Sequence, residues 1–314
     1  MEERIAVLRQ KIHGMDASEY RDAIDARLPE CRVDLATTPA EEREYLESAT
    51  VATGLEIAPA DLDAADDLSL FACVYAGTDH LDLDAFEKRG IAVTNASGVH
   101  GSNIAEYVTG SMIAMSQRFP RAWDQQENAE WRAYPTRELH GSTAAIVGLG
   151  EIGRTVADRL AAFGMETVGV RYTPEKGGPT DEVYGFPEIH EAVADAEYVV
   201  IACRLSEATA GLIDAAVLRT MPSDALLVNV ARGPVVETAA LVESLQSNAI
   251  GGAVLDVTDP EPLPQDHVLW SMGDVMITPH NSGHTPEYYE RCADILAANV
   301  EARAEGGELE NRVV

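Results

Sequence analysis

Lysine is nearly absent from this chain of 314 residues. Only three of its 23 basic residues are lysines, whereas 53 residues are acidic and the formal net charge is −30. A surface so rich in carboxylates repels phosphate backbones, so nucleic acid is excluded as an expected partner. Because acidity alone does not explain the scarcity of lysine, we expect adaptation to high salt, where ions screen self-repulsion within about 3 Å at 1 M. An ordinary acidic cytosolic enzyme is the alternative.

Cysteine is scarce too, and long apolar runs are absent. The four cysteines form no C-x-x-C pair and have no histidine at metal-ligand spacing beside them, so we expect reduced thiols and no metal site. No run of eighteen apolar residues occurs, and the charged first residues lack the apolar core of a signal peptide. The sequence therefore predicts a soluble, cytoplasmic protein that does not bind membranes.

Hydrophobic residues, at 46% of the chain, suffice for the cores of about two domains. In the first part of the chain, apolar runs predict the strands of a small α/β sheet at 5–8, 32–36, 50–53 and 68–75. A helix over 103–118 is apolar on nearly every face, which is typical of a helix buried between two bodies. A last helix over 286–304, capped by Thr285, is expected to return to the N-terminal body.

A second alternation of strands and helices starts at Ser142. Its apolar runs predict six strands, at 143–147, 166–170, 198–203, 225–230, 252–257 and 276–278. Strands that alternate with helices are typical of a parallel, doubly wound sheet. We therefore predict a doubly wound, Rossmann-type α/β domain over 96–283, inserted into a smaller, flavodoxin-like α/β domain formed by 1–95 and 284–314.

The strand at 143–147 runs directly into the glycine-rich string GLGEIG, which a helix follows. In such a loop Gly148 permits the tight turn, Gly150 lets the backbone approach a pyrophosphate, and Gly153 lets the helix pack closely on the strand. The helix N-terminus adds N–H groups and partial positive charge. This sequence context predicts dinucleotide binding by the larger domain.

The end of the next strand bears on the choice of coenzyme. NAD enzymes normally carry there an acid that bonds the adenosine ribose, but this chain has Arg171, followed by Tyr172 and Thr173. A guanidinium can pair with a 2′-phosphate and stack on adenine, so NADP(H) is favoured and NAD(H) is expected to serve less well. A solvated surface arginine is the alternative.

Three polar residues follow later strands, at the edge where a doubly wound sheet opens its ligand crevice: Arg232, Glu261 and His280. Singly, each is explained by a surface salt bridge or a hydrogen-bonded loop histidine. Together they supply what ketone reduction needs. A planar cation fixes a carboxylate, a histidine transfers the proton, and a carboxylate keeps that histidine protonated.

Several segments together resemble the D-isomer-specific 2-hydroxyacid dehydrogenases. They are the GLGEIG loop and the strings at 76–97 (AGTDHLDLDAFEKRGIAVTNAS), 229–237 (NVARGPVVE), 252–264 and 278–285 (TPHNSGHT). The resemblance covers residues 71–284. It implies a hydride transfer between NAD(P)(H) and a 2-keto acid/D-2-hydroxy acid pair, with Arg232, Glu261 and His280 as the catalytic triad.

The resemblance also implies the binding residues. Backbone N–H groups of Tyr75, Ala76 and Gly77 hold the substrate carboxylate together with Arg232, and Asp256 binds the nicotinamide carboxamide. With the residues already argued from the glycine loop and the strand end, the expected coenzyme contacts are Gly148, Gly150, Glu151, Ile152, Gly153, Arg171, Tyr172, Thr173, Arg204, Leu205, Ser206, Thr209, Val230, Ala231, Asp256, His280 and Gly283.

This chain departs from the family pattern at two places. Arg204 stands where the family often has proline, and Tyr75–Gly77 replaces a Gly-Val-Gly-like string, so we expect a second cation near the adenosine and a narrower substrate pocket. Glu261 argues against a formate dehydrogenase, which has Gln there. The resemblance further implies a homodimer through the helix at 103–118 and its flanking segment. A corepressor that uses the dinucleotide as an assembly switch is the alternative function, against which the retained triad weighs.

Overall fold

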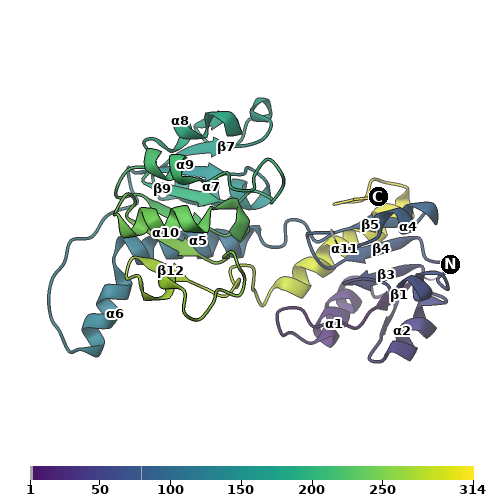
Figure 1. The fold of residues 1–314 in the computed structure, drawn as a ribbon. Coiled ribbons are helices and arrows are strands. Elements are labelled where there is room, and N and C mark those ends of the chain that lie inside the picture. Colours follow the sequence, from purple (N-terminus) through teal and green to yellow (C-terminus); the bar gives the residue numbers. More distant parts are fainter. Residues whose placement is uncertain (1–2, 79) are drawn as a thin grey trace. The chain divides into compact units, whose positions relative to one another are not determined.

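The computed structural model describes residues 3–78 and 80–314, which form two compact units (Figure 1). Unit 1 runs up to His100 and resumes at His284, and unit 2 is Gly101–Gly283. The chain therefore first crosses from unit 1 to unit 2 after His100, five residues beyond the predicted boundary at residue 95. The reason is that Ala96 and Val99 are buried in the core of unit 1.

Unit 1 contains a parallel five-stranded sheet in the order β2-β1-β3-β4-β5. This is the flavodoxin-like order, as predicted. The strands are β1 (Arg4–Val7), β2 (Arg32–Leu35), β3 (Val51–Gly54), β4 (Leu70–Cys73) and β5 (Ala92–Thr94). The first four overlap the predicted runs. The fifth, a strand of three residues that ends at the polar Thr94, was not predicted.

Both faces of this sheet are buried, because successive residues of a strand point to opposite sides. Ile5 and Val7 face one apolar cluster and Ala6 the other. Helices α1 (Ala17–Arg27) and α11 (Tyr288–Glu305) supply side chains to the first cluster. The second cluster takes side chains from α2 (Pro39–Leu46), α3 (Pro59–Leu62) and α4 (Leu83–Lys88).

Helix α11 begins later than predicted. The expected start was Pro286 with Thr285 as the cap, but the helix starts at Tyr288 with Glu287 at the N-cap position. The Thr285 hydroxyl instead accepts a hydrogen bond from the Glu287 N–H at 3.2 Å. This local turn uses the side chain that would otherwise have capped a helix starting at Pro286.

Unit 2 is built on a parallel sheet in the order β12-β11-β10-β9-β6-β7-β8. The strands are β6 (Thr143–Val147), β7 (Glu166–Val170), β8 (Glu182–Tyr184), β9 (Tyr198–Ile201), β10 (Leu226–Asn229), β11 (Gly252–Leu255) and β12 (Val275–Ile277). The prediction missed β8, a short edge strand without buried residues. The chain reverses its direction of winding between β6 and β9, and in such sheets ligands bind at that point, outside the carboxyl ends of the strands.

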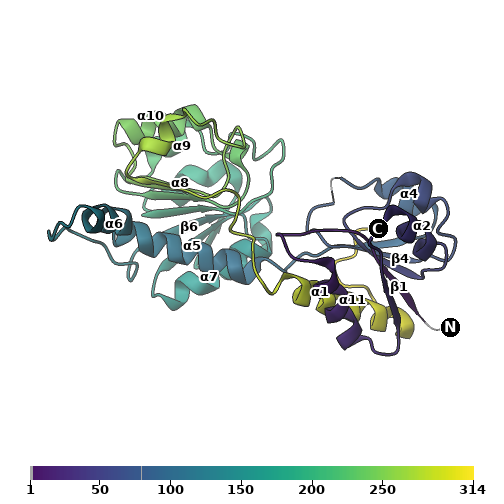
Figure 2. The same ribbon diagram turned by 90° about the horizontal axis from the view of Figure 1, so that it is seen from below.

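Helices cover both faces of this sheet. Helices α5 (Gly101–Ser116) and α7 (Glu151–Ala162) pack on one face, and α8 (Ile189–Val193), α9 (Ala215–Thr220) and α10 (Thr238–Gln246) pack on the other. Figures 1 and 2 show that α6 (Phe119–Glu127) and the extended segment after it project away from the rest of unit 2. Four short 3₁₀ turns complete the described part of the unit: η1 (Pro174–Lys176), η2 (Phe186–Glu188), η3 (Gly233–Val235) and η4 (Val268–Ser271).

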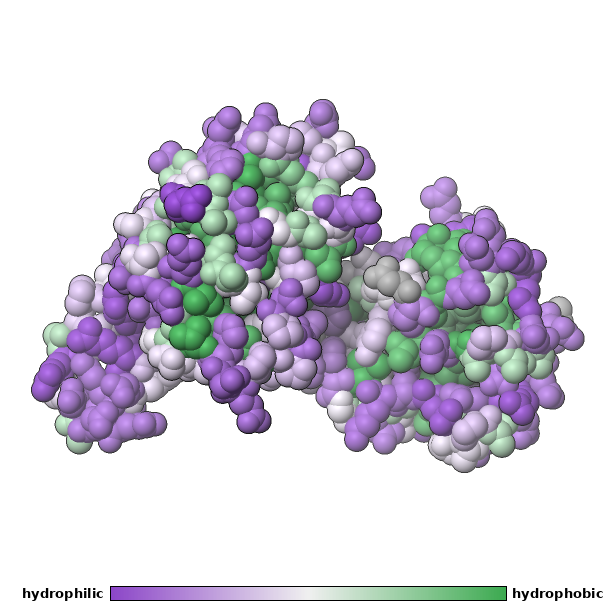
Figure 3. Space-filling view, viewed as in Figure 1, coloured by the Kyte–Doolittle hydropathy of each residue, from purple (hydrophilic) through white to green (hydrophobic). Residues whose placement is uncertain are grey.

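Cys73, Cys203 and Cys292 are buried free thiols, as the sequence predicts. Burial raises the pKa of Cys203 to about 11 and that of Cys292 to about 12, so both remain protonated at neutral pH. On the faces shown in Figure 3, hydrophilic residues cover most of each unit and hydrophobic residues show only in small patches.

Candidate active site

The dinucleotide loop lies at the carboxyl end of β6, and α7 starts at Glu151 with Gly150 as its N-cap. Gly148 has a φ of 104°, and a Cβ there would lie 2.5 Å from the backbone N of Cys203. A Cβ on Gly153 would lie 1.8 Å from the Gly148 carbonyl oxygen. By contrast, a Cβ on Gly150 would meet nothing within 4 Å. Two glycines are thus required by packing, and the third leaves an open approach to the helix N-terminus, which fits a pyrophosphate.

Arg171 directly follows β7 at the same edge of the sheet, where an acid would select NAD. Its side chain is half-buried, and Nη1 donates to the Gly177 carbonyl at 2.5 Å. This bond anchors the guanidinium beside the turn η1. Tyr172, the next residue, is 79% exposed and packs edge-on against Phe186. An anchored cation and an exposed ring at this position suit the 2′-phosphate and adenine of NADP.

The loop after β9 carries the second predicted cation, Arg204, which is exposed together with Leu205. Thr209, by contrast, is buried. Its hydroxyl donates to the Arg204 carbonyl at 2.6 Å and accepts from the Ser206 N–H at 2.8 Å. Thr209 therefore shapes the loop that presents Arg204 and Leu205, a role that the resemblance does not imply.

Glu261 and His280 lie side by side. Glu261 is in the loop after β11 and His280 is in the loop after β12, and the two strands are neighbours. His280 Nδ1 lies 2.7 Å from Glu261 Oε1. Because a carboxylate accepts hydrogen bonds, Nδ1 carries the proton of this bond. Nε2 is then the ring nitrogen left to meet a substrate, and both side chains are nearly half exposed.

Arg232 comes from the adjacent strand β10 and is exposed. Its Nη1 donates to the Ala231 carbonyl at 2.7 Å. Gly233 packs directly on the loop that carries Glu261, since a Cβ on it would lie 2.0 Å from the Thr258 carbonyl oxygen. The three predicted catalytic residues therefore follow three adjacent strands at one edge of one sheet.

Asp256 is 1% exposed and holds the loop of His280. Its carboxylate accepts hydrogen bonds from the Thr278 hydroxyl at 2.6 Å and from the N–H groups of Asn281 at 2.7 Å and Ser282 at 2.9 Å. Its backbone carbonyl accepts from the His280 N–H at 2.8 Å. The resemblance implies a contact with the nicotinamide carboxamide, but these bonds make Asp256 a support of the histidine loop. Sequence reasoning missed Thr278, although it stands directly after β12.

In unit 1, the predicted carboxylate-binding loop Tyr75–Gly77 follows β4, and all three residues are exposed. The Ala96 N–H donates to the Tyr75 carbonyl at 3.1 Å, and Asn95 Nδ2 donates to the Ala76 carbonyl at 2.7 Å. Asn95 is therefore a supporting residue that sequence reasoning did not single out. Its position directly after β5 was hidden because β5 itself was not predicted.

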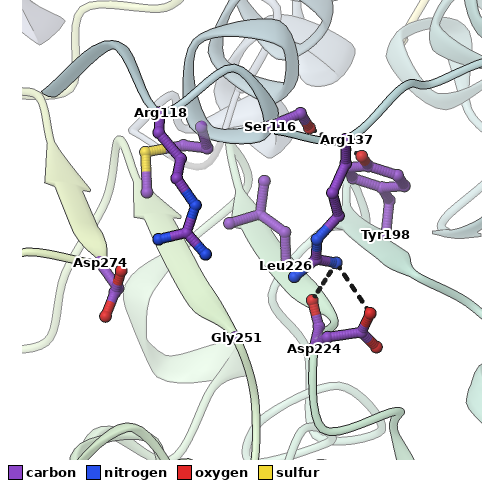
Figure 4. A pocket seen from close by; sticks show the side chains of 9 residues that line it. Ser116, Arg118, Arg137, Tyr198, Asp224, Leu226, Gly251 and Asp274 are labelled. Atoms are coloured by element: carbon purple, nitrogen blue, oxygen red, sulfur yellow. Dashed lines mark hydrogen bonds and ion pairs between the residues drawn. The ribbon is translucent and has the colours of Figure 1, made fainter. Parts of the chain in front are cut away.

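A small cavity opens at the opposite, amino edge of the unit 2 sheet (Figure 4). Arg137 forms one wall and is bonded to the carbonyl and carboxylate of Asp224, and Tyr198 and Arg118 form others. The cavity has a volume of about 50 Å³, which is room for a few waters. Because this edge is remote from the carboxyl ends of the strands, the cavity is not the reaction site.

Within residues 3–78 and 80–314, no group of three or more His, Cys, Asp or Glu residues could hold a metal ion. In the same part of the chain, no helix is long and apolar enough to cross a membrane.

Residues 109–282 match the sequence profile of the NAD binding domain of D-isomer specific 2-hydroxyacid dehydrogenases. This chain belongs to that family. It is an NAD(P)-dependent dehydrogenase, and the predicted family and fold class are confirmed.

The family contains relatives that cover most of this chain. A glyoxylate reductase from Thermofilum pendens is 35% identical over 256 residues, which are 78% of this chain and 74% of that protein. A family member from Aeromonas salmonicida has a crystal structure with a TM-score of 0.84 and 30% identity, covering 100% of this chain and 99% of that one. A member from Xanthobacter autotrophicus, solved with NADPH and MES, has a TM-score of 0.81 and 26% identity, covering 99% of this chain and 98% of that one.

Proposed function

We propose that this dehydrogenase reduces a small 2-keto acid to the D-2-hydroxy acid, with NADPH as the preferred coenzyme, and that Arg232, Glu261 and His280 carry the reaction. The observation that carries this proposal is the 2.7 Å contact between His280 Nδ1 and Glu261 Oε1. The contact lies at the carboxyl edge of the sheet that also carries the dinucleotide loop. A histidine with one nitrogen fixed by a carboxylate presents the other nitrogen as a proton donor.

When bound, the coenzyme would supply the hydride that the keto carbon receives. The protein has three tasks in this step. Arg232 pairs with the substrate carboxylate and stabilises the negative charge that develops on the carbonyl oxygen. His280 donates the proton on Nε2 to that oxygen, which completes the hydroxyl group. Glu261 stabilises the imidazolium before the transfer and keeps the ring oriented, and in the reverse reaction His280 takes the proton back.

The substrate is expected to be short. The loop Tyr75–Gly77 binds its carboxylate through backbone N–H groups, and the tyrosine side chain, 39% exposed, narrows the space beside that loop. The relative that acts as a glyoxylate reductase supports a substrate of this size. We place the reaction in the cytoplasm and at high salt. The high-salt part of this proposal is supported by the chain's formal net charge of −30 with almost no lysine.

NADPH is proposed over NADH because Arg171 replaces the acid that would repel a 2′-phosphate, and its guanidinium is already anchored by the Gly177 carbonyl. Arg204 adds a second exposed cation at the neighbouring loop. The Xanthobacter autotrophicus structure with NADPH supports this choice.

A homodimer is also proposed. Three large apolar side chains are exposed on or beside the projecting helix α6: Phe119 at 41%, Trp123 at 56% and Trp131 at 102%. Apolar side chains grouped on a projecting segment mark an interaction surface. Helix α5 and this segment would form the interface with a second copy of the chain.

The proposal is tested by steady-state kinetics in molar salt with glyoxylate, hydroxypyruvate, pyruvate and a longer branched 2-keto acid, each with NADPH and with NADH. We expect the highest kcat/KM for a short 2-keto acid with NADPH, and a D-configured product on a chiral column. Lack of turnover with every acid, while NADPH still binds, would favour a binding role over catalysis.

A further inference from the structure

Two polar side chains of α5 reach the loop that carries His280. Asn103 Nδ2 donates to the Ser282 carbonyl at 2.8 Å, and the Tyr107 hydroxyl lies 2.6 Å from Thr278 Oγ1. Asn103 and Tyr107 are four residues apart and therefore lie on the same face of the helix. Tyr107 bonds the loop at Thr278, before His280, and Asn103 bonds it at Ser282, after His280.

We propose that Asn103 and Tyr107 are positioning residues for proton transfer: Tyr107 holds the His280 loop through Thr278, and Asn103 holds it through Ser282. The inference rests on the proposed role of His280 as the proton donor. It adds that the loop of His280 is supported by α5, a helix that carries none of the three proposed catalytic residues.

The bonds around Thr278 determine which group donates in the series from Tyr107 through Thr278 to Asp256. Two backbone N–H groups, those of Asn281 and Ser282, donate to Asp256, one to each carboxylate oxygen. The Thr278 hydroxyl donates its proton to the same carboxylate. A hydroxyl has one proton, so the Thr278 oxygen can only accept from Tyr107. Tyr107 must therefore donate, and a phenylalanine in its place would leave Thr278 without that donor.

The Tyr107 hydroxyl keeps its proton at every pH at which such an enzyme works. Burial raises the pKa of Tyr107 to about 12, and the bond with Thr278 offsets only part of this rise. The support is thus independent of pH around neutrality. A pH-dependent change in activity after loss of this hydroxyl would then arise from His280 and its partner Glu261.

The loop needs this support because His280 has a φ of 53°, in the left-handed region that a non-glycine residue rarely adopts. The conformation persists only where surrounding bonds define it. Here the bonds to Asp256 lie on both sides of the histidine, and the α5 side chains fix the two flanks. Small displacements of a proton donor reduce catalysis strongly, because transfer requires a defined geometry.

Helix α5 is suited to this task because it also packs on α7, the helix of the dinucleotide loop. A Cβ on Gly101 would lie 2.9 Å from Thr155 Oγ1 of α7. The same helix therefore contacts the element that binds the coenzyme pyrophosphate and the loop that carries the proton donor.

The test compares Tyr107→Phe with a matched control, Tyr198→Phe. The Tyr198 hydroxyl bonds Ser116 Oγ at 2.7 Å, so each variant loses one tyrosine-to-hydroxyl bond of unit 2, but Tyr198 starts β9 at the amino edge of the sheet. Both variants should lose a similar amount of thermal stability. Only Tyr107→Phe should lower kcat, by about three- to tenfold, which corresponds to about 0.6–1.4 kcal/mol. Its dissociation constant for NADPH should be unchanged, and the pH profile of kcat should shift.

Two further variants keep the inference testable if Tyr107→Phe alone gives no clear result. Thr278→Val removes the bond to Tyr107 and also the bond to Asp256, so it should lower kcat at least as much as Tyr107→Phe, and it serves as the test if Tyr107→Phe does not fold. Asn103→Ala combined with Tyr107→Phe should lower kcat by less than the product of the single effects, because both act on one loop.

The inference is overturned if Tyr107→Phe keeps the kcat and pH profile of Tyr198→Phe while the wild-type enzyme reduces 2-keto acids normally. A His280→Ala variant with undiminished turnover would be a different result. It would refute the proposed role of His280, and the inference with it.

Discussion

His13, in the loop after β1, lies among other aromatic rings of unit 1. Its imidazole stacks on His284, with ring centroids 4.1 Å apart, and is tilted against Tyr288 at 4.7 Å and His100 at 5.8 Å. Its Nδ1 atom is buried and has no hydrogen-bond partner among the described residues. Burial, together with positive charge on His284 and His100, lowers the pKa of His13 from 6.5 to about 4.

This depressed pKa predicts an acid-sensitive fold. The folded state binds the proton on His13 less readily than the unfolded state, so stability increases with pH between about 4 and 6.5. The stability that neutral His13 gives the folded state is fully present above pH 6.5 and is lost as the pH falls toward 4. A pKa that falls from 6.5 to about 4 would be worth about 3 kcal/mol at 1.36 kcal/mol per pKa unit. Because the ring is only partly buried, solvent screening reduces this to about 1–2 kcal/mol.

The assay is urea unfolding in molar salt at about pH 7.5 and at about pH 4.5, for the wild type and for His13→Phe. Phenylalanine keeps a ring in the stack but does not titrate. Carboxylates titrate in both proteins, so the difference between them isolates His13. The wild type should lose about 1–2 kcal/mol more than the variant on acidification. Equal losses in the two proteins would refute the reasoning.

Three other predictions concern the coenzyme, the proton donor and the surface. Arg171→Asp should reverse the preference from NADPH to NADH by changing the ratio of dissociation constants about ten- to a hundredfold, measured by fluorescence titration. If Arg171→Ala leaves both constants unchanged, Arg171 is a surface residue. Glu261→Gln should shift the pH profile of kcat, because the variant removes the charge that stabilises the imidazolium; an identical profile would count against the pairing. The melting temperature should be higher at about 1 M salt than at about 0.1 M, because only the stronger solution screens the net charge at short range. A flat response would contradict salt adaptation.

The sequence predicted the secondary structure best where an element is defined by residues that are contiguous in the chain. The strands at 143–147 and 166–170 were predicted with the bounds that β6 and β7 have, because each is a run of apolar residues between clear turns. Strands β5 and β8 were missed. β8 has no buried side chain, whereas β12, which is equally short but consists of three apolar residues, was predicted. The start of α11 was misplaced because Thr285 forms a local turn with Glu287 instead of a helix cap.

The same holds for the candidate site, where only the features formed by contiguous residues could be predicted. The dinucleotide loop could be predicted because its glycines, its strand and its helix are contiguous in the sequence. The support of His280 could not, because the bond between Tyr107 and Thr278 joins residues 171 positions apart, and the bond between Asn103 and Ser282 spans 179. Thr209 was assigned to the coenzyme from the family resemblance, but the fold buries it and uses its hydroxyl within the loop.

The central claim is that His280, fixed by Glu261, donates the proton in the reduction of a 2-keto acid. The most direct measurement is kcat for glyoxylate reduction by His280→Ala, together with its dissociation constant for NADPH. The account predicts a loss in kcat of about 10²- to 10⁴-fold, because proton transfer by a positioned side chain contributes that much, and a far smaller change in the dissociation constant for NADPH, because His280 is only one of many expected coenzyme contacts. Turnover close to that of the wild type would contradict it.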